Sequence, residues 1–185
     1  MRIIAGSAKG TRLGPVPAGT RPVSDRAREG VFASLAGRVV DARVLDLFAG
    51  TGAMGIEALS RGAADARFVD GSPRAVATIR DNLARARLEG RVQRSDVLRA
   101  LRSGRGSEDP YDLVFLDPPY DLGSTDLEPC LAALGEGWLP ADGWTVIVTR
   151  GQKGSLPAVP LHWAVARQLR YGDSLLTLYR EVGWA

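Results

Sequence analysis

Short apolar runs alternate with amphipathic stretches along most of the chain. Buried strands are predicted by apolar runs at 43–47, 66–70, 92–95, 112–117 and 144–150. Helices are predicted at 54–61 and 72–88. A final pair of strands, 162–169 and 174–180, is joined at Tyr171-Gly172. Strands separated by helices indicate right-handed crossovers, so we expect an α/β fold with a mostly parallel sheet.

The first forty residues follow a different pattern. Residues 2–13 contain two short extended pieces around Gly6 to Gly10, which predict a small hairpin. The prolines and glycines of 14–19 predict a loop, and Ser24 is placed to cap a helix that ends near Leu35. We therefore expect a hairpin extension over 1–19 and one domain over 20–185.

Charge is distributed unevenly over the 185 residues, whose net charge is +3. The local charge is +5 over residues 1–40, −5 over 41–149 and +3 over 150–185. Basic ends around an acidic centre are compatible with a phosphate-rich partner. The single cysteine excludes an internal disulfide, and no apolar run has the length of a signal peptide or a membrane span. We expect a cytoplasmic protein that does not contact a membrane.

A glycine-rich turn follows the first predicted strand. Residues 46–55 read DLFAGTGAMG, in which Gly50, Gly52 and Gly55 satisfy G-x-G-x-x-G between a strand and a helix. Glycine permits close approach of the backbone to a ligand. Asp70 ends the next strand 18 residues after Gly52, where a carboxylate can accept hydrogen bonds from ribose hydroxyls. This arrangement fits a dinucleotide or a nucleoside cofactor, and a plain tight turn is the alternative.

Two further acids favour a nucleoside without a pyrophosphate. Asp46 lies just before the turn, where a carboxylate would repel a pyrophosphate but attract a cation. Asp96 follows the third strand and is placed to accept from an adenine amine, although it could equally cap a helix over 97–101. Acids at three successive strand ends suit S-adenosylmethionine, which carries an amino group, a ribose, an adenine and a sulfonium.

A second motif, Asp117-Pro118-Pro119-Tyr120, follows the apolar strand LVFL. The exocyclic amine of a base is a poor nucleophile because its lone pair is delocalised into the ring. The Asp117 carboxylate and the Pro118 carbonyl can accept both N–H groups of such an amine, and Tyr120 can stack on the base. The alternative is a proline turn that only ends the strand.

These segments resemble a known family. DLFAGTGAMGIEALSRGA (46–63), FVD (68–70) and FLDPPY (115–120) resemble class I amino-methyltransferases. The segments at 2–13, 20–35 and 171–179 resemble the RsmD-type enzymes, which modify the N2 amine of a guanine in bacterial small-subunit 16S rRNA. The resemblance covers nearly the whole chain. It implies a Rossmann-like, seven-stranded sheet whose last strand is antiparallel, and an enzyme that uses S-adenosylmethionine.

The resemblance implies that Gly50, Gly52 and Asp70 hold the cofactor and that residues 117–120 hold the target base. Together with the residue arguments above, it completes the expected site. Cofactor-binding residues are expected at the following positions: Asp46, Phe48, Gly50, Thr51, Gly52, Asp70, Asp96 and Asp117. Catalytic roles fall on Asp117, Pro118 and Tyr120, and Pro119 and Tyr120 hold the base. The sequence departs from the family at Thr149, where relatives often have a glutamate, so no acid acts at this position.

The basic N-terminus is the candidate RNA-binding region. We expect Lys9, Arg12, Arg21 and Arg26 to contact phosphates, together with Arg2 and Arg28. Solvation of a helix face is the alternative for the arginines at 21, 26 and 28. The expected partner is small-subunit rRNA or the assembling 30S particle, and the expected state is a monomer without a metal.

Three other functions remain open on the residues alone. The D-P-P-Y motif does not specify which base is methylated, so a DNA adenine-N6 or cytosine-N4 amino-methyltransferase is an alternative. A nicotinamide oxidoreductase would use the glycine turn but leave D-P-P-Y unexplained, and a non-catalytic RNA-binding module would not need the intact motifs. The lone histidine, His162, and Cys130 are not expected to take part in catalysis.

Overall fold

The computed structural model describes residues 1–14, 23–119, 122–151 and 155–183. Its helices are α1 (Asp25–Leu35), the 3-10 helix η1 (Ala36–Arg38), α2 (Ala53–Ser60), α3 (Pro73–Ala86), α4 (Val97–Arg102) and α5 (Ser124–Gly135). Its strands are β1 (Arg43–Leu47), β2 (Asp65–Asp70), β3 (Arg91–Arg94), β4 (Leu113–Leu116), β5 (Thr145–Gly151), β6 (Trp163–Tyr171) and β7 (Ser174–Glu181). The seven predicted strands of the sheet are confirmed, with ends that lie within two residues of the prediction. The hairpin predicted over residues 2–13 is reduced to one antiparallel bridge.

The strands form one seven-stranded sheet in the order β3-β2-β1-β4-β5-β7-β6. Strands β1 to β5 pair in parallel, and β7 runs antiparallel to both of its neighbours, β5 and β6. The strand order reverses at β1 and β4, and ligands bind at such a reversal in open α/β sheets. The α/β class and the antiparallel last strand are thus confirmed.

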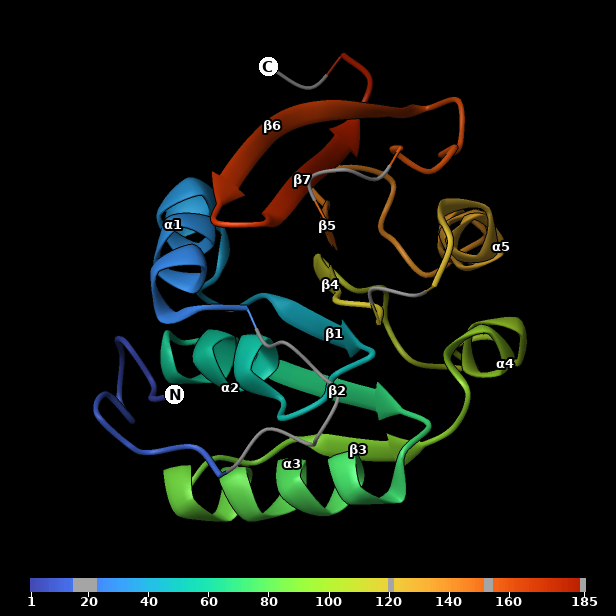
Figure 1. Cartoon of the computed structure of the whole chain (residues 1–185). Coiled ribbons are helices and arrows are strands. Elements are labelled where there is room, and N and C mark those ends of the chain that lie inside the picture. The colour runs from blue at the N-terminus through green and yellow to red at the C-terminus, as the bar shows by residue number, and fades with distance from the viewer. Residues whose placement is uncertain (15–22, 120–121, 152–154, 184–185) are drawn as a thin grey trace.

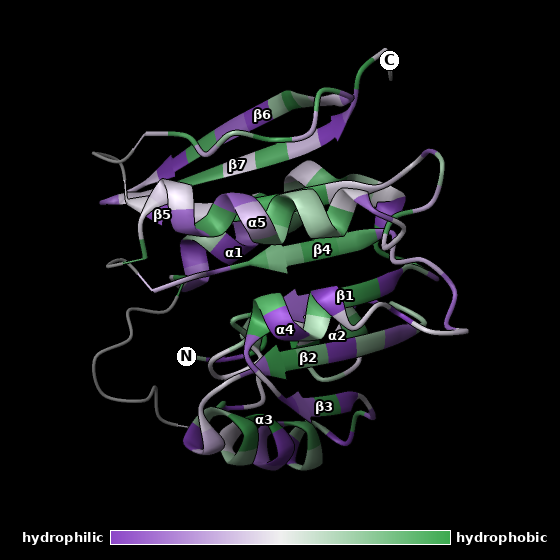
Figure 2. Ribbon diagram, turned by 90° about the vertical axis from the view of Figure 1, so that its right-hand side faces the viewer, coloured by the Kyte–Doolittle hydropathy of each residue, from purple (hydrophilic) through white to green (hydrophobic). Residues whose placement is uncertain are grey.

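Helices cover both faces of the sheet. Figure 1 shows α1, α2 and α3 on one side, and Figure 2 looks onto the other side, which carries α4 and α5. Each side has its own apolar core: Val31 and Phe32 of α1 pack in the first, and Leu127 and Leu131 of α5 pack in the second. Alternation along the strands assigns successive side chains to opposite cores.

The helix starts follow the predicted capping. The Ser24 side chain accepts from the Ala27 N–H at the start of α1, and the Ser72 side chain does the same for Ala75 in α3. The third helix ends at Ala86, two residues earlier than predicted, because Arg87 adopts a left-handed conformation with φ 55°. No helix within the described ranges is long and apolar enough to cross a membrane.

The N-terminal segment, residues 1–14, turns back on itself and lies against α2. One antiparallel bridge joins Arg2 to Arg12. The buried Glu57 carboxylate of α2 accepts from the backbone N–H groups of Ile4 (2.8 Å) and Ala5 (3.0 Å). Gly6 has φ +85°, and a Cβ there would lie 1.7 Å from the Ser60 carbonyl oxygen. The segment is therefore docked on the domain, and a division at residue 19 stays a prediction.

Candidate active site

Three acids lie at the carboxyl edge of the sheet, and one of them is within electrostatic reach of the other two. Asp46 lies in β1, Asp70 ends β2, and Asp117 follows β4, while β1 pairs with both of the other strands. Burial raises the pKa of Asp46 well above its ordinary value, and the charges of Asp117 and Asp70 raise it further. The structure therefore brings together three of the acids that the sequence singled out, in a site that a cation would stabilise.

Asp46 is 1% exposed, and its carboxylate accepts from the Gly55 N–H of α2 at 2.9 Å. This bond partly offsets the effect of burial on the pKa. The side chain thus ties β1 to the first turn of α2 while remaining within electrostatic reach of the other two acids.

The glycine turn connects β1 to α2 through left-handed backbone conformations. Gly50 has φ +56° and Gly52 has φ +74°. Phe48 also adopts a left-handed conformation, with φ 55°, although it has a Cβ. Such strain in a non-glycine residue costs on the order of 1–3 kcal/mol and is typical of ligand-binding turns. The Gly52 N–H closes the turn by donating to the Ala49 carbonyl at 2.7 Å.

Asp70 holds the turn with one carboxylate oxygen and the start of α3 with the other. Its Oδ2 accepts from the Gly50 N–H at 2.9 Å, and its Oδ1 accepts from the Ser72 N–H at 2.8 Å. Each carboxylate oxygen can accept about two hydrogen bonds, so both oxygens keep capacity for ribose hydroxyls. The side chain can therefore shape the turn and bind a ligand at the same time.

Asp96 caps α4, as the alternative interpretation of this residue predicted. Its Oδ1 accepts from the Arg99 N–H at 2.9 Å. The exposed carboxylate keeps its second oxygen for another donor, so its contact with an adenine amine stays a prediction.

Asp117, directly after β4, has a pKa that burial shifts toward neutrality. Desolvation raises the pKa of Asp117 to about 7, against the opposing effect of a hydrogen bond with the Thr149 side chain. Thr149 is buried in β5, beside Asp117 in the register that pairs Leu116 with Val148. A hydroxyl thus occupies the position where the family resemblance implied a glutamate.

The rest of the D-P-P-Y motif is described only in part. Pro118 is buried and Pro119 is exposed at the end of β4. Tyr120 lies outside the described residues, and so does Arg21. The stacking role of Tyr120 and the phosphate contact of Arg21 therefore stay predictions.

The basic residues of the N-terminal region separate into two groups. Arg2, Lys9, Arg12 and Arg26 are exposed, as RNA contacts require. Arg28 is 0% exposed and donates to the Arg2 carbonyl at 2.6 Å and to the Asp25 carboxylate at 2.7 Å. The expectation that Arg28 contacts phosphate is wrong, and so is its alternative of a solvated helix face, because this side chain joins α1 to the N-terminal segment.

Two buried polar residues were missed by the sequence analysis. Asn82 of α3 donates to the Thr51 carbonyl in the glycine turn, and Glu57 of α2 anchors the N-terminal segment. Both lie on helical faces otherwise occupied by apolar side chains, such as Ile79 and Leu83 in α3. A polar residue at a core position of a helix was the signal that could have revealed them. Buried polar groups need hydrogen-bond partners, so such a residue indicates a contact with another segment.

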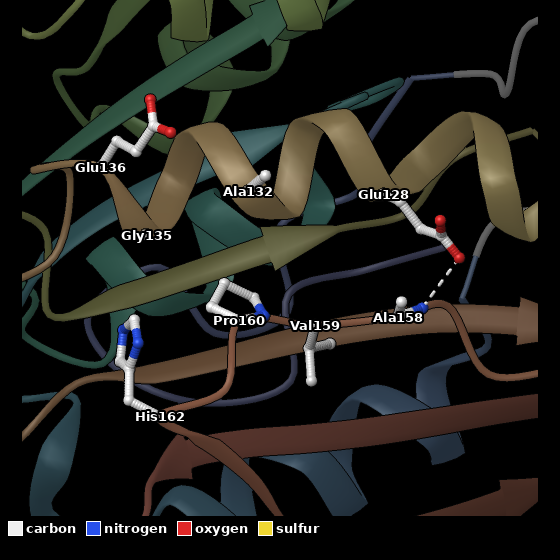
Figure 3. A pocket seen from close by; sticks show the side chains of 8 residues that line it. All are labelled: Glu128, Ala132, Gly135, Glu136, Ala158, Val159, Pro160 and His162. Atoms are coloured by element: carbon white, nitrogen blue, oxygen red, sulfur yellow. Dashed lines mark hydrogen bonds between the residues drawn. The ribbon is translucent and has the colours of Figure 1, made fainter.

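The histidine and the pocket beside it lie away from the acidic edge. Figure 3 shows a pocket of about 370 Å³ between α5 and the segment that precedes β6. His162 lines this pocket, and its Nε2 accepts from the Trp163 side chain at 3.1 Å. None of the predicted site residues lines it. Within the described residues, no group of three or more histidine, cysteine or acidic side chains could hold a metal.

Comparisons with known proteins identify the family. A family model described as "Conserved hypothetical protein 95" matches residues 1–180. The chain is 39% identical over 185 residues to ribosomal RNA small subunit methyltransferase D of Escherichia coli K12, covering 98% of this chain and 90% of that protein. A Thermus thermophilus structure described as a hypothetical protein is 32% identical, with a TM-score of 0.81 over 98% of this chain and 99% of that chain.

A more distant structure shares the fold alone. The SMU.776 structure, described as a complex with SAH, is 16% identical, with a TM-score of 0.68 over 88% of this chain and 50% of that chain. Near full-length similarity to the E. coli enzyme, together with the family match over residues 1–180, shows that the chain belongs to the ribosomal RNA small subunit methyltransferase D family.

Proposed function

We propose that this protein is an RNA methyltransferase that transfers a methyl group from S-adenosylmethionine to the exocyclic N2 amine of a guanine in small-subunit 16S rRNA. The observation that carries this proposal is the placement of Asp46, Asp70 and Asp117 at one edge of the sheet, where the charges of the other two act on Asp46 and Asp70 holds the glycine turn. The name of the E. coli relative supports rRNA as the substrate class. The proposal places the enzyme in the cytoplasm as a monomer acting on naked rRNA or the assembling 30S particle.

The site fits S-adenosylmethionine on its own chemistry. The cofactor supplies a methyl group bound to a positively charged sulfur. After transfer of the methyl group, this sulfur is a neutral thioether. Asp70 would accept from the ribose hydroxyls, Asp96 from the adenine amine, and Asp46 and Asp117 would lie near the positive charges. The backbone of Phe48, Gly50, Thr51 and Gly52 forms the turn against which the cofactor would lie. The complex with SAH in a protein of the same fold is consistent with this cofactor.

Asp117 and Pro118 would orient the target amine. An ionised Asp117 accepts one amine N–H and the Pro118 carbonyl accepts the other, which helps to localise the nitrogen lone pair. Pro119 and Tyr120 would hold the base, with Tyr120 stacking on its face. Because the pKa of Asp117 is about 7, the carboxylate is available as an acceptor above neutral pH and is partly protonated below it.

The exposed basic residues Lys9, Arg12 and Arg26, together with Arg21, would hold the RNA backbone near this acidic site. Arg2 and Arg12 face each other across the antiparallel bridge, where like charges are destabilising. Among the described residues, neither guanidinium forms an ion pair with an acid. A phosphate bound beside the two arginines would offset this repulsion.

The test is transfer of radiolabel from S-adenosylmethionine to purified small subunits, naked 16S rRNA and DNA, followed by nucleoside analysis. We expect label in N2-methylguanosine from small subunits or from 16S rRNA. Label in N6-methyladenine or N4-methylcytosine from DNA would instead identify a DNA amino-methyltransferase. An absence of label from all three substrates would overturn the proposal.

A further inference from the structure

Asn82 links the cofactor turn to the N-terminal segment through a single buried amide. Its side chain is 0% exposed on α3. Its Oδ1 accepts from the Gly14 N–H at 2.6 Å, and its Nδ2 donates to the Thr51 carbonyl at 2.9 Å. Thr51 lies between the two left-handed glycines of the turn, and Gly14 is the last described residue of the N-terminal segment. One side chain therefore connects two regions that are 37 residues apart in the sequence.

The hydrogen bond from Asn82 leads from the turn to another region of the chain. Asp70 holds the Gly50 N–H, and the Ala49 carbonyl holds the Gly52 N–H, so these two bonds involve only the turn and the end of β2. The bond to the Thr51 carbonyl differs from these two because its partner, Asn82, lies on α3. Its donor is the same amide that holds Gly14.

The N-terminal segment also rests on α2, the helix that begins directly after Gly52. Glu57 holds the backbone of Ile4 and Ala5, and the Ser60 hydroxyl accepts from the Ala8 N–H at 3.0 Å. The segment is thus docked on both helices that flank the turn, α2 and α3. A shift of the segment relative to these helices would act on the turn from two sides.

We infer that Asn82 is a positioning residue that couples RNA binding by the N-terminal segment to cofactor binding by the glycine turn. The inference rests on the proposed function. A buried amide that loses one of its two partners leaves polar groups unsatisfied, which carries the full desolvation cost. Each of the two hydrogen bonds therefore stabilises the Asn82 orientation that the other needs. RNA that fixes the N-terminal segment would in this way also stabilise the Asn82 hydrogen bond to the Thr51 carbonyl.

Linkage makes this coupling measurable from either side. If RNA raises the affinity for the cofactor by some factor, the cofactor raises the affinity for RNA by the same factor. We expect a factor of about five or more in the wild-type protein, the lower end of typical couplings. The probes are S-adenosylhomocysteine, whose affinity is measured by calorimetry with and without 16S rRNA, and 16S rRNA itself with and without S-adenosylhomocysteine.

The decisive variant is Asn82→Asp. While ionised, aspartate keeps an acceptor for the Gly14 N–H but has no donor for the Thr51 carbonyl, so affinities are measured at a pH high enough to keep it ionised. We expect about tenfold weaker binding of S-adenosylhomocysteine, nearly unchanged binding of 16S rRNA alone, and a coupling factor close to one. Asp81→Ala is the matched control, because Asp81 is exposed on the same helix. This control should keep the wild-type affinities and the wild-type coupling factor.

Direct contact between the bound base and the cofactor is a second source of coupling, and Asp117→Ala separates the two. This variant weakens the hold on the base but leaves Asn82 and both of its partners in place, so the coupling should persist. The inference is overturned if Asn82→Asp retains the wild-type coupling factor, or if the coupling disappears in Asp117→Ala but not in Asn82→Asp.

The wild-type protein keeps the inference testable even if Asn82→Asp does not fold, which thermal unfolding would reveal. Wild-type protein that binds both probes with a coupling factor of one overturns the inference alone. Wild-type protein that binds neither probe overturns the proposed function instead.

Discussion

The acidic edge, formed by Asp46, Asp70 and Asp117, and the N-terminal segment use charged side chains in opposite ways. At the edge, Asp46 and Asp70 accept from backbone N–H groups, so they shape the turn that they adjoin. In the N-terminal segment the backbone is held by Glu57 and Ser60 of α2, and the cations of the segment itself are exposed.

The difference indicates two kinds of recognition. Carboxylates fixed by the backbone can bind a small cofactor in one geometry, because little side-chain entropy is lost on binding. Exposed arginine and lysine side chains can follow an irregular phosphate backbone without reading its sequence. Substitutions at the acidic edge should therefore act on chemistry and cofactor affinity, and substitutions in the N-terminal segment on RNA affinity and its dependence on salt.

The largest expected effect is on chemistry. Asp117→Ala should lower the rate constant of methyl transfer by about 100-fold or more, because the target amine loses its charged acceptor. Cofactor affinity should fall much less. Single-turnover kinetics and calorimetry measure the two effects. If cofactor affinity and turnover fell together by the same factor, the main role of Asp117 would be to bind the cofactor and not to orient the base.

Asp70→Ala should give the next largest effect and act on cofactor affinity. The variant would lose the two proposed hydrogen bonds to the ribose, and it loses the bonds that hold the Gly50 and Ser72 N–H groups. At about 1 kcal/mol for each ribose bond, affinity should fall about 10- to 100-fold. Calorimetry with S-adenosylhomocysteine measures it. Unchanged affinity in a folded variant would remove Asp70 from the cofactor site.

The N-terminal segment should respond through salt dependence. Lys9→Ala with Arg12→Ala should weaken binding to 16S rRNA and flatten the slope of log K against log salt by about 0.7–0.9 for each phosphate that is no longer neutralised. Point substitutions suit this test better than truncation, because Ile3 and Leu13 of the segment are buried in the core. Parallel slopes with equal affinities would mean that these side chains do not bind phosphate.

A smaller effect is expected from pH. Protonated Asp117 is a weaker acceptor for the amine N–H than the carboxylate, so kcat/KM should rise with pH through about 7. The Thr149 hydrogen bond lowers the pKa of Asp117, so Thr149→Val should move this rise to higher pH and lower the rate a few-fold at pH 7. Thr149→Ser, which keeps the hydroxyl, should restore the profile. A profile that stays unchanged in Thr149→Val would contradict this role.

Most of the fold followed from periodicity because the strands are short, apolar and separated by helices with clear starts. Residues such as Ser24 and Ser72 act locally, so a few neighbouring residues were enough to predict their capping roles. The acids at strand ends were predictable for a related reason, since parallel strands deliver their carboxyl ends to one edge.

The sequence did not reveal contacts between residues far apart in the chain. Arg28 looked like an exposed cation, but its burial depends on the Arg2 carbonyl, 26 residues away. Asn82 has hydrogen-bond partners in two distant loops, and the sequence of its own helix does not indicate which residues they are. The strained φ of Phe48 also depends on how the turn is held, because local preference favours glycine there.

The lone thiol has a practical consequence. Cys130 of α5 is 3% exposed, and burial raises the pKa of its thiol to about 11. Only the thiolate reacts with disulfide and alkylating reagents, and a thiol with this pKa is almost wholly protonated at neutral pH. Modification must therefore wait until α5 separates from the sheet. The rate of thiol labelling in native buffer therefore reports how often α5 opens, and the measurement needs no engineered probe.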